Sequence, residues 1–334
     1  SSPVSTKYVS TYKFGQFERI LSMENVDLAA LRKLAWNGVP SKYRAGVWQM
    51  LLGYLPTNKT RRVTALQRKR KEYTDLVKTY FTMGQTDRTK QDEENHSQIL
   101  IDLPRTSPNV AFFQQNIVQN AMERILYIWS IRHPASGYVQ GMNDLLTPLL
   151  LVSLQPFVED PLRCDVATLE TGVMACVEAD AYWCLAKLLD NIQDHYTFGQ
   201  PGLQRMIQRL EDLIHRLDNE LFMHFQTQGV MFQFFTTRWM NCYLLRELPL
   251  HSILRIWDTY IAEETGGYEN FHVYVCVVLL KTFKEQVINM EFQDILLFLQ
   301  NLPTQDWNED EVEPILSQAF ILSTLFENSP SHLS

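Results

Sequence analysis

An arginine and a glutamine, Arg105 and Gln140, are the side chains of this sequence best suited to chemistry on a charged ligand. A guanidinium is permanently charged and presents its N–H donors in a planar fork that matches phosphate or carboxylate oxygens. A carboxamide both accepts and donates hydrogen bonds, so it can hold a polar group beside that cation. Taken alone, each residue is more often a solvated surface side chain. Their chemistry therefore depends on whether the fold brings them together.

Arg105 is expected to follow a short extended segment. The polar residues at 84–98 are expected to form a loop. The apolar run at 99–101 that follows leads into Pro104, which fixes its own φ and has no N–H to donate. A proline also biases the residue before it, here Leu103, away from the helical region. The sequence therefore predicts that Arg105 lies just beyond a pinned, extended piece of backbone.

A long helix is expected between the two residues. Ser107 is suited to cap it, with Pro108 at the first helical position. Apolar residues at spacings of three and four continue it over 110–132, and glycines on both sides of Tyr138 then permit a sharp turn. A straight helix of roughly 25 residues is ~37 Å long, too long for its two ends to meet one ligand. We therefore expect the helix to bend or break, or the loop at 135–141 to fold back along it.

The usual catalytic signatures are absent from the sequence. It contains neither common type of phosphate-binding glycine loop, no His-Glu-x-x-His and no serine in a nucleophile elbow. The eight histidines form no i, i+4 pair on one helix, and the five cysteines form no C-x-x-C. These patterns predict no metal site, no cofactor of the chain's own and a reducing compartment without disulfides.

The composition is that of a helical globular protein. Hydrophobic residues make up 46% of the 334 positions, glycines number only 13, and no stretch alternates at period two for long. A net charge of −8 argues against nucleic acid as a general partner. The most apolar runs, 145–154 and 273–280, are interrupted or shorter than the ~20 residues of a membrane span, and the first twenty residues lack a signal-peptide pattern.

Four segments are expected along the chain. They are a flexible N-terminal segment at 1–22, an N-terminal helical lobe at 23–192 that carries Arg105 and Gln140, a C-terminal helical lobe at 193–328, and a tail at 329–334. The closely spaced Gly199, Pro201 and Gly202 indicate the seam between the lobes.

An ordered set of motifs resembles that of the TBC-domain GTPase-activating proteins, which act on Rab GTPases. The most specific are Ile99-x-x-Asp102-x-x-Arg105 and Tyr138-x-Gln140. The others, in the family's order, are Gly38-Val39-Pro40 with Arg44 and Trp48, Leu51-Leu52-Gly53, Arg238-Trp239, Leu244-Leu245-Arg246-Glu247 and Leu254-Arg255-Ile256-Trp257-Asp258. The resemblance extends over residues 31–325, and the ordered set is far more specific than any single motif.

The resemblance implies an all-α, two-lobed TBC domain that activates a Rab GTPase in its GTP form. Arg105 and Gln140 would act in trans as catalytic fingers, and the glutamine would take over the water-orienting role of the GTPase's own glutamine. Asp102, Tyr138 and Arg44 would support them. GTP and Mg would belong to the partner, and the protein would not be an enzyme by itself. It would work in vesicle trafficking from the cytoplasm, with recruitment to endomembranes such as the Golgi or vesicles.

An alternative is a TBC-type binding module that recognises a GTPase or another partner without accelerating hydrolysis. Three positions depart from the family pattern, namely Val39, Ser107 and Val139. Because neither finger is replaced, these departures concern substrate preference, and the intact pair favours the activator. An independent helical enzyme has no supporting motif.

A basic stretch lies between Lys59 and Lys78, where eight basic residues stand against two acidic ones. The simplest interpretation is that these residues form the solvated face of a helix without a binding function. The functional alternatives are a peripheral contact with an anionic membrane surface and a contact with an adaptor or an acidic patch on the partner GTPase.

Overall fold

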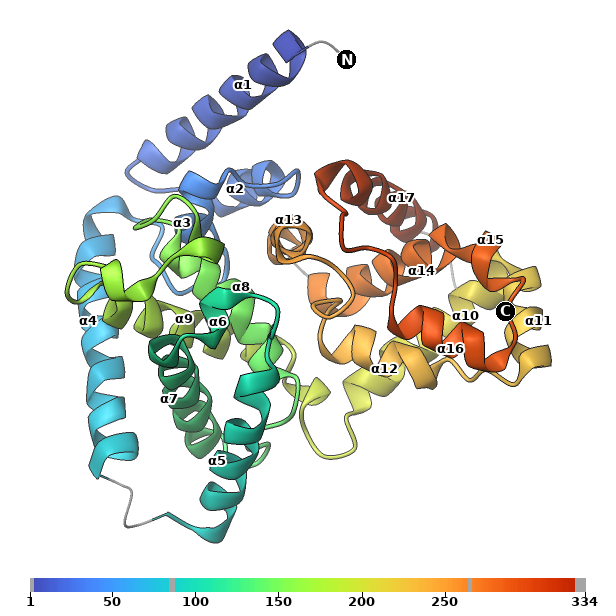
Figure 1. The fold of residues 1–334 in the computed structure, drawn as a ribbon. Helices are drawn as coiled ribbons and strands as arrows, with labels where there is room; N and C mark the ends of the chain where they lie inside the picture. Colours follow the sequence, from blue (N-terminus) through green and yellow to red (C-terminus); the bar gives the residue numbers. More distant parts are fainter. Residues whose placement is uncertain (1–2, 84–87, 264–265, 328–334) are drawn as a thin grey trace. The chain divides into compact units, whose positions relative to one another are not determined.

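The computed structural model describes residues 3–83, 88–263 and 266–327, and throughout these ranges the regular elements are helices (Figure 1). An isolated antiparallel bridge between Asn25 and Asn58 is the β pairing found there. The all-α expectation is therefore confirmed. The chain divides into two compact units, Ser1–Asn191 and Ile192–Ser334. The expected tail at 329–334 lies outside the described residues.

The first unit contains the following helices. They are α1 (Pro3–Ser22), α2 (Leu28–Ala35), α3 (Ser41–Leu51), α4 (Lys59–Leu76), the π-helix η1 (Val77–Met83), α5 (Lys90–Asp102), the 3-10 turn η3 (Leu103–Arg105), α6 (Ala111–Gln114), α7 (Asn116–Arg132), α8 (Met142–Leu154), the 3-10 turns η4 (Pro161–Arg163) and η5 (Val166–Thr168), and α9 (Val173–Asn191).

Helix α8 is the centre of the first unit. All its residues are buried, because it packs against α3, α7 and α9. Two carboxylates of α9 attach that helix to its other neighbours. Asp180 accepts hydrogen bonds from Arg70 on α4, the shorter at 2.7 Å, and Glu178 accepts two at 2.8 Å from Arg124 on α7. Charged pairs in a partly buried site thus fix α9 between α4 and α7.

The second unit contains the remaining helices. They are the 3-10 turn η6 (Gln193–His195), α10 (Pro201–Leu217), α11 (Asn219–Gln228), α12 (Gln233–Asn241), α13 (Leu250–Ala262), the π-helix η7 (Gly267–Phe271), α14 (His272–Thr282), α15 (Lys284–Val287), α16 (Phe292–Gln300) and α17 (Glu309–Glu327).

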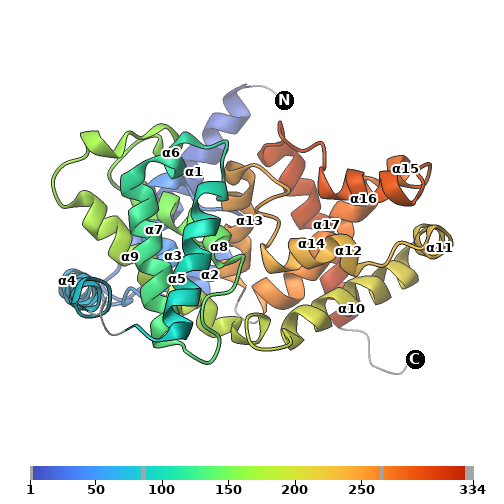
Figure 2. The same ribbon diagram turned by 60° about the horizontal axis from the view of Figure 1, so that its bottom comes forward.

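The core of the second unit is built on α13 and α14, which are buried over most of their length. Figure 2 shows α14 among α10, α12 and α17. Helix α17 packs against both, and α10 packs against α14. Trp239 and Trp257 are fully buried here, as Trp48 is in the first unit, so these tryptophans are core residues. Glu309 and Asp310 lie in the first turn of α17, where the helix dipole favours acidic side chains.

Two segments of the first unit differ from expectation. Within 1–22, expected to form a flexible segment, residues 3–22 are helical as α1 and residues 1–2 lie outside the described residues. The buried Phe17 of α1 stacks on Tyr43 of α3 with ring centroids 6.1 Å apart. The polar stretch at 84–98, expected to be a loop, is helical from Lys90 onward, whereas 84–87 lie outside the described residues. Thr89 starts this helix through a reciprocal capping box with Asp92.

Candidate functional site

Arg105 ends the turn η3 at the C-terminus of α5. The extended segment predicted for 99–104 is wrong, since Leu103 is helical with φ −57° and ψ −47°. Pro104 is accommodated because it lies in the first turn of η3, where its missing N–H has no intrahelical acceptor to lose. The prediction that Ser107 caps a helix is also wrong. Ser107 has φ 43°, and the next helix, α6, begins at Ala111.

The guanidinium of Arg105 is anchored on one side and open on the other. Its Nε and one terminal nitrogen donate to Oδ1 of Asp102 at 3.1 and 2.5 Å. The Asp102 side chain is 1% exposed, whereas that of Arg105 is 54% exposed. A buried carboxylate therefore orients the arginine while further N–H donors remain directed outward.

Asp102 also binds the loop that carries Gln140. The hydroxyl of Tyr138 donates to Oδ2 of Asp102 at 2.8 Å, and Gln98 donates to Oδ1 at 3.2 Å. Burial and the neighbouring carboxylate of Asp102 raise the pKa of Tyr138, so its hydroxyl keeps its proton as the donor. The same carboxylate therefore holds the arginine and the glutamine loop.

A second set of hydrogen bonds closes this network, which we call the Asp102 network (Asp102, Arg105, Thr106, Tyr138 and Asn143). Asn143 donates to the hydroxyl of Thr106 at 2.8 Å, and Thr106 donates in turn to the carbonyl of Asp102 at 2.9 Å. The carbonyl oxygen of Asn143 lies 3.1 Å from the Tyr138 hydroxyl. Thr106 and Asn143 are buried, and the sequence did not predict their role. Its only signal is a polar residue directly after Arg105 and another three positions after Gln140.

Gln140 is exposed at the tip of a loop that is fixed on both sides. Before it, the backbone N–H of Tyr138 donates to Asn95 of α5 at 3.3 Å. After it, Gly141 adopts φ 110° and donates to Asn143 at 3.0 Å, where α8 begins. This left-handed backbone favours glycine, so the turn that presents Gln140 depends on that residue type.

The helix predicted over 110–132 is broken, as the geometric condition required. Gln115 has φ −72° and ψ 133° between α6 and α7. Its side-chain amide donates to the carbonyl of Cys164 at 2.7 Å and accepts from the N–H of Val166 at 2.9 Å, so the break is tied to the segment at 164–166. The loop after α7 then returns to α5, because Tyr138 reaches both Asn95 and Asp102. Both parts of the expectation, the break and the returning loop, are confirmed.

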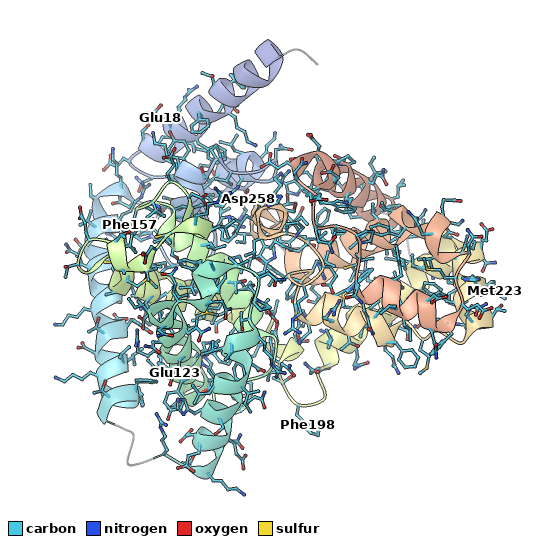
Figure 3. All side chains as sticks on the ribbon, in the orientation of Figure 1. Glu18, Glu123, Phe157, Phe198, Met223 and Asp258 are labelled. Atoms are coloured by element: carbon cyan, nitrogen blue, oxygen red, sulfur yellow. The ribbon has the colours of Figure 1, made fainter. Side chains whose placement is uncertain are left out.

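Helices α5 and α7 pack side by side, and this packing sets the position of Arg105. His96 of α5 lies 2.6 Å from Glu123 of α7, which is labelled in Figure 3. The rings of His96 and Tyr127 meet edge-on with centroids 5.2 Å apart. Arg44 is buried in α3, a helix that packs against α8. Its expected place beside the fingers stays a prediction.

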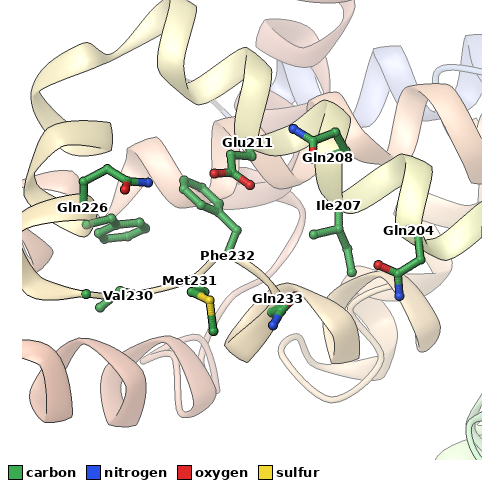
Figure 4. Close-up of a pocket in the computed structure, with 11 residues that line it drawn as sticks. Gln204, Ile207, Gln208, Glu211, Gln226, Val230, Met231, Phe232 and Gln233 are labelled. Atoms are coloured by element: carbon green, nitrogen blue, oxygen red, sulfur yellow. The ribbon is translucent and has the colours of Figure 1, made fainter.

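A separate hollow of about 380 Å³ lies in the second unit between α10, α11 and α12 (Figure 4). Amide and apolar side chains line it, and Glu211 is its one ionisable residue. Burial raises the pKa of Glu211. The lining contains no cation and no nucleophile, and among the described residues no cluster of His, Cys, Asp or Glu could hold a metal ion. The Asp102 network is therefore the stronger candidate site.

Sequence comparison identifies the class of protein to which this all-α chain belongs. The sequence pattern of the Rab-GTPase-TBC domain matches residues 41–288, and the chain belongs to this family. The motif-based resemblance is therefore confirmed.

Particular relatives are similar over nearly the whole chain. The GTPase-activating protein gyp1 of Schizosaccharomyces pombe is 47% identical over 320 residues, which are 95% of this chain and 62% of that protein. Human TBC1 domain family member 22B is 45% identical over 323 residues, again 95% of this chain and 62% of that protein. The chain thus spans about three fifths of the length of these relatives.

Solved structures agree with this assignment. The crystal structure of the Ypt/Rab-GAP domain of Gyp1p has a TM-score of 0.89 at 43% identity, and the match covers 95% of this chain and 99% of that one. A Chlamydomonas flagellar RabGAP TBC domain, at 19% identity and a TM-score of 0.60, shares the fold. No helix among the described residues is long and apolar enough to cross a membrane.

Proposed function

We propose that this chain is a GTPase-activating protein for Rab-type small GTPases and that Arg105 and Gln140 act in trans on the GTP of the partner. The observation that carries the proposal is the Asp102 network, in which one buried carboxylate orients an exposed guanidinium and holds the loop of an exposed glutamine. Relatives whose names describe GTPase-activating proteins support it. The nucleotide and its Mg belong to the partner.

The chemistry of GTP hydrolysis explains why these residue types are needed. Negative charge redistributes over the phosphate oxygens in the transition state, and a water molecule must be held in line with the bond that breaks. An arginine supplied in trans contributes about 10³ to 10⁵ in rate, which corresponds to roughly 4 to 7 kcal/mol of barrier. Because Asp102 holds Arg105 before the partner arrives, less of its side-chain entropy remains to be lost on binding. Gln140 would accept from the attacking water and donate toward the phosphate.

This activity would place the protein in membrane trafficking, at the cytoplasmic face of endomembranes such as the Golgi or vesicles. The five cysteines are all free, which suits a reducing compartment. The flanking regions of the longer relatives are where further contacts would arise.

Single-turnover GTP hydrolysis across a panel of purified Rab GTPases tests the proposal. We expect the wild-type chain to accelerate at least one member, and Arg105→Ala to remove at least about 10³-fold of that acceleration. Gln140→Ala is expected to cause a comparable loss, because the water is no longer oriented. Arg163→Ala and Gln16→Ala, at exposed positions away from the network, serve as matched controls and should retain the wild-type rate.

The competing function is a module that binds a GTPase without activating it. Its signature is binding to a GTP-loaded Rab with no acceleration beyond a few-fold, or acceleration that Arg105→Ala and Gln140→Ala leave unchanged. Either result would contradict the proposed activity and leave the fold assignment intact.

A further inference from the structure

The basic residues of α4 fall into two sets, and the first is occupied within the first unit. Arg62 donates to the backbone carbonyls of Leu21, Pro56 and Thr57. Lys69 pairs with Glu72 at 2.7 Å and lies 4.1 Å above the ring of Trp183. Arg70 pairs with Asp180. These three cations hold α4 in place, so they are not available for an external partner.

The second set points away from the unit. Its members, all exposed, are Lys59, Arg61, Arg68 and Lys71 of α4 and Lys78 at the start of η1. Arg61, Arg68 and Lys71 lie within about 80° of one another around the helix axis, at 100° per residue. Arg68 is 70% exposed and lies 3.7 Å from Glu72, a weak contact at that distance. Lys59, the first residue of the helix, lies about 160° from Arg61 on the same count. We call the other four residues, Arg61, Arg68, Lys71 and Lys78, the α4 basic face.

The surface around these cations is mostly neutral and holds one acidic residue. Thr60, Thr64, Gln67 and Thr74 are exposed neutral residues there, and the exposed Asp75 lies within about 40° of Arg68 and Lys71 around the axis, so the cations outnumber the exposed acid. Val63, 64% exposed, is the large apolar side chain that α4 presents outward. From Arg61 to Lys78 the face is ~26 Å long at 1.5 Å per residue. In both ribbon views, α4 lies at the outer edge of the first unit (Figures 1 and 2).

We propose that the α4 basic face binds an anionic lipid membrane surface. Interfaces between proteins centre on buried aromatic or apolar anchors in a matching pocket, whereas this convex face presents long cationic side chains with one exposed valine, Val63, at its edge. Spaced cations with an apolar contact are what an anionic bilayer surface attracts. Because the whole chain carries a net charge of −8, other orientations would be repelled, so α4 would also set the orientation of the molecule on the membrane.

Vesicle co-sedimentation of the full chain tests this proposal without any GTPase. The probes are phosphatidylcholine vesicles with and without phosphatidylserine. We expect binding only to the anionic vesicles and its loss at high ionic strength, because the Debye length falls from about 10 Å at 0.1 M to 3 Å at 1 M salt. Replacing three cations by glutamine, as Arg61→Gln, Lys71→Gln and Lys78→Gln together, should lower the partition coefficient on the order of a hundredfold.

A matched triple variant, with Lys33→Gln, Lys90→Gln and Arg163→Gln, removes the same charge from exposed positions elsewhere in the first unit. It should bind anionic vesicles far better than the α4 variant, and an equal loss in both would overturn the proposal. So would equal binding of the wild type to neutral vesicles, or no binding to anionic ones. Loss of GTPase stimulation in solution by the α4 variant would show instead that this face contacts the GTPase. Since the vesicle assay contains no GTPase, failure here is distinguishable from failure of the proposed activity.

Discussion

Asp102 performs two tasks that are usually given to separate residues. It is the counter-charge of Arg105 and the acceptor that ties down Tyr138, and its side chain is almost completely buried. Burying a carboxylate is costly unless its oxygens accept hydrogen bonds from well-placed donors. Here Arg105, Tyr138 and Gln98 supply those donors. Loss of any donor should therefore weaken both the fold and the position of the arginine.

The substitution Tyr138→Phe tests this coupling, because it removes one hydroxyl and leaves the ring in place. We expect the free energy of unfolding to fall by about 1 to 3 kcal/mol, since Asp102 loses a buried hydrogen bond. GTPase stimulation should fall as well, while Arg105 itself remains. Urea denaturation and single-turnover hydrolysis measure the two effects. Tyr12→Phe, at a 70% exposed tyrosine, is the control that should change neither.

A Tyr138→Phe variant with wild-type stability and wild-type stimulation would contradict the role given to this hydroxyl. A loss of stability with full stimulation would limit the hydroxyl to folding. The stimulated rate is therefore the measurement that separates positioning of the fingers from support of the core.

At the scale of elements, α5 shows what a periodicity argument overlooks. The sequence predicted a polar loop because most residues from Lys90 to Gln98 are hydrophilic. The inward side of the helix nevertheless includes Asn95 and Asp102, which are buried because they bind the Tyr138 loop. A polar network thus takes positions that apolar residues would hold in an ordinary amphipathic helix.

A break in the helix predicted over 110–132 could be expected because a straight helix would separate Arg105 from Gln140. The local sequence did not indicate that the break lies at Gln115. The partners of Gln115 are the backbone groups of Cys164 and Val166, which lie about fifty residues further along the chain. Such a long-range contact leaves no local pattern in the sequence. The family motifs, by contrast, are short local patterns, and together they predicted the family correctly.

Three helices of the second unit meet at His272, and this junction should make stability depend on pH. His272 of α14 accepts from the Tyr260 hydroxyl of α13 at 2.7 Å and donates to the Trp239 carbonyl of α12 at 3.0 Å. Complete burial lowers the pKa of His272 from 6.5 to about 3. Between these two values the unfolded chain binds a proton that the folded chain does not. Stability from this group is therefore complete above pH ~6.5 and is lost as the pH falls, by about 1.4 kcal/mol per unit.

The variant His272→Gln isolates this effect, since an amide can still accept from Tyr260 and donate to Trp239. Between pH 7 and pH 5 the wild type should lose roughly 2 kcal/mol more stability than the variant. Urea denaturation at both pH values measures the difference. The exposed His251→Gln is the control, and its pH dependence should match that of the wild type. If the free energies of unfolding of wild type and His272→Gln changed in parallel with pH, His272 would not be the source of the pH dependence.

At the scale of the whole molecule, activation and simple recognition differ in the state of the GTPase that is bound most tightly. An activator is complementary to the transition state, so it prefers a GTPase loaded with GDP and aluminium fluoride, which imitates the transferring phosphoryl group. A binding module without catalytic fingers has no reason for this preference. Both functions share the fold, and affinity for the GTP-bound form alone does not separate them.

We therefore expect the wild-type chain to bind a responsive Rab with GDP and aluminium fluoride at least about a hundredfold more tightly than the same Rab with GDP. Arg105→Ala should remove most of this preference, because the guanidinium contributes where charge develops, whereas Arg163→Ala should retain it. Calorimetry or interferometry with the full chain provides the measurement. Equal affinity of wild type and Arg105→Ala for the transition-state mimic would mean that the exposed guanidinium never reaches the nucleotide. The Asp102 network would then serve the architecture of the first unit rather than catalysis.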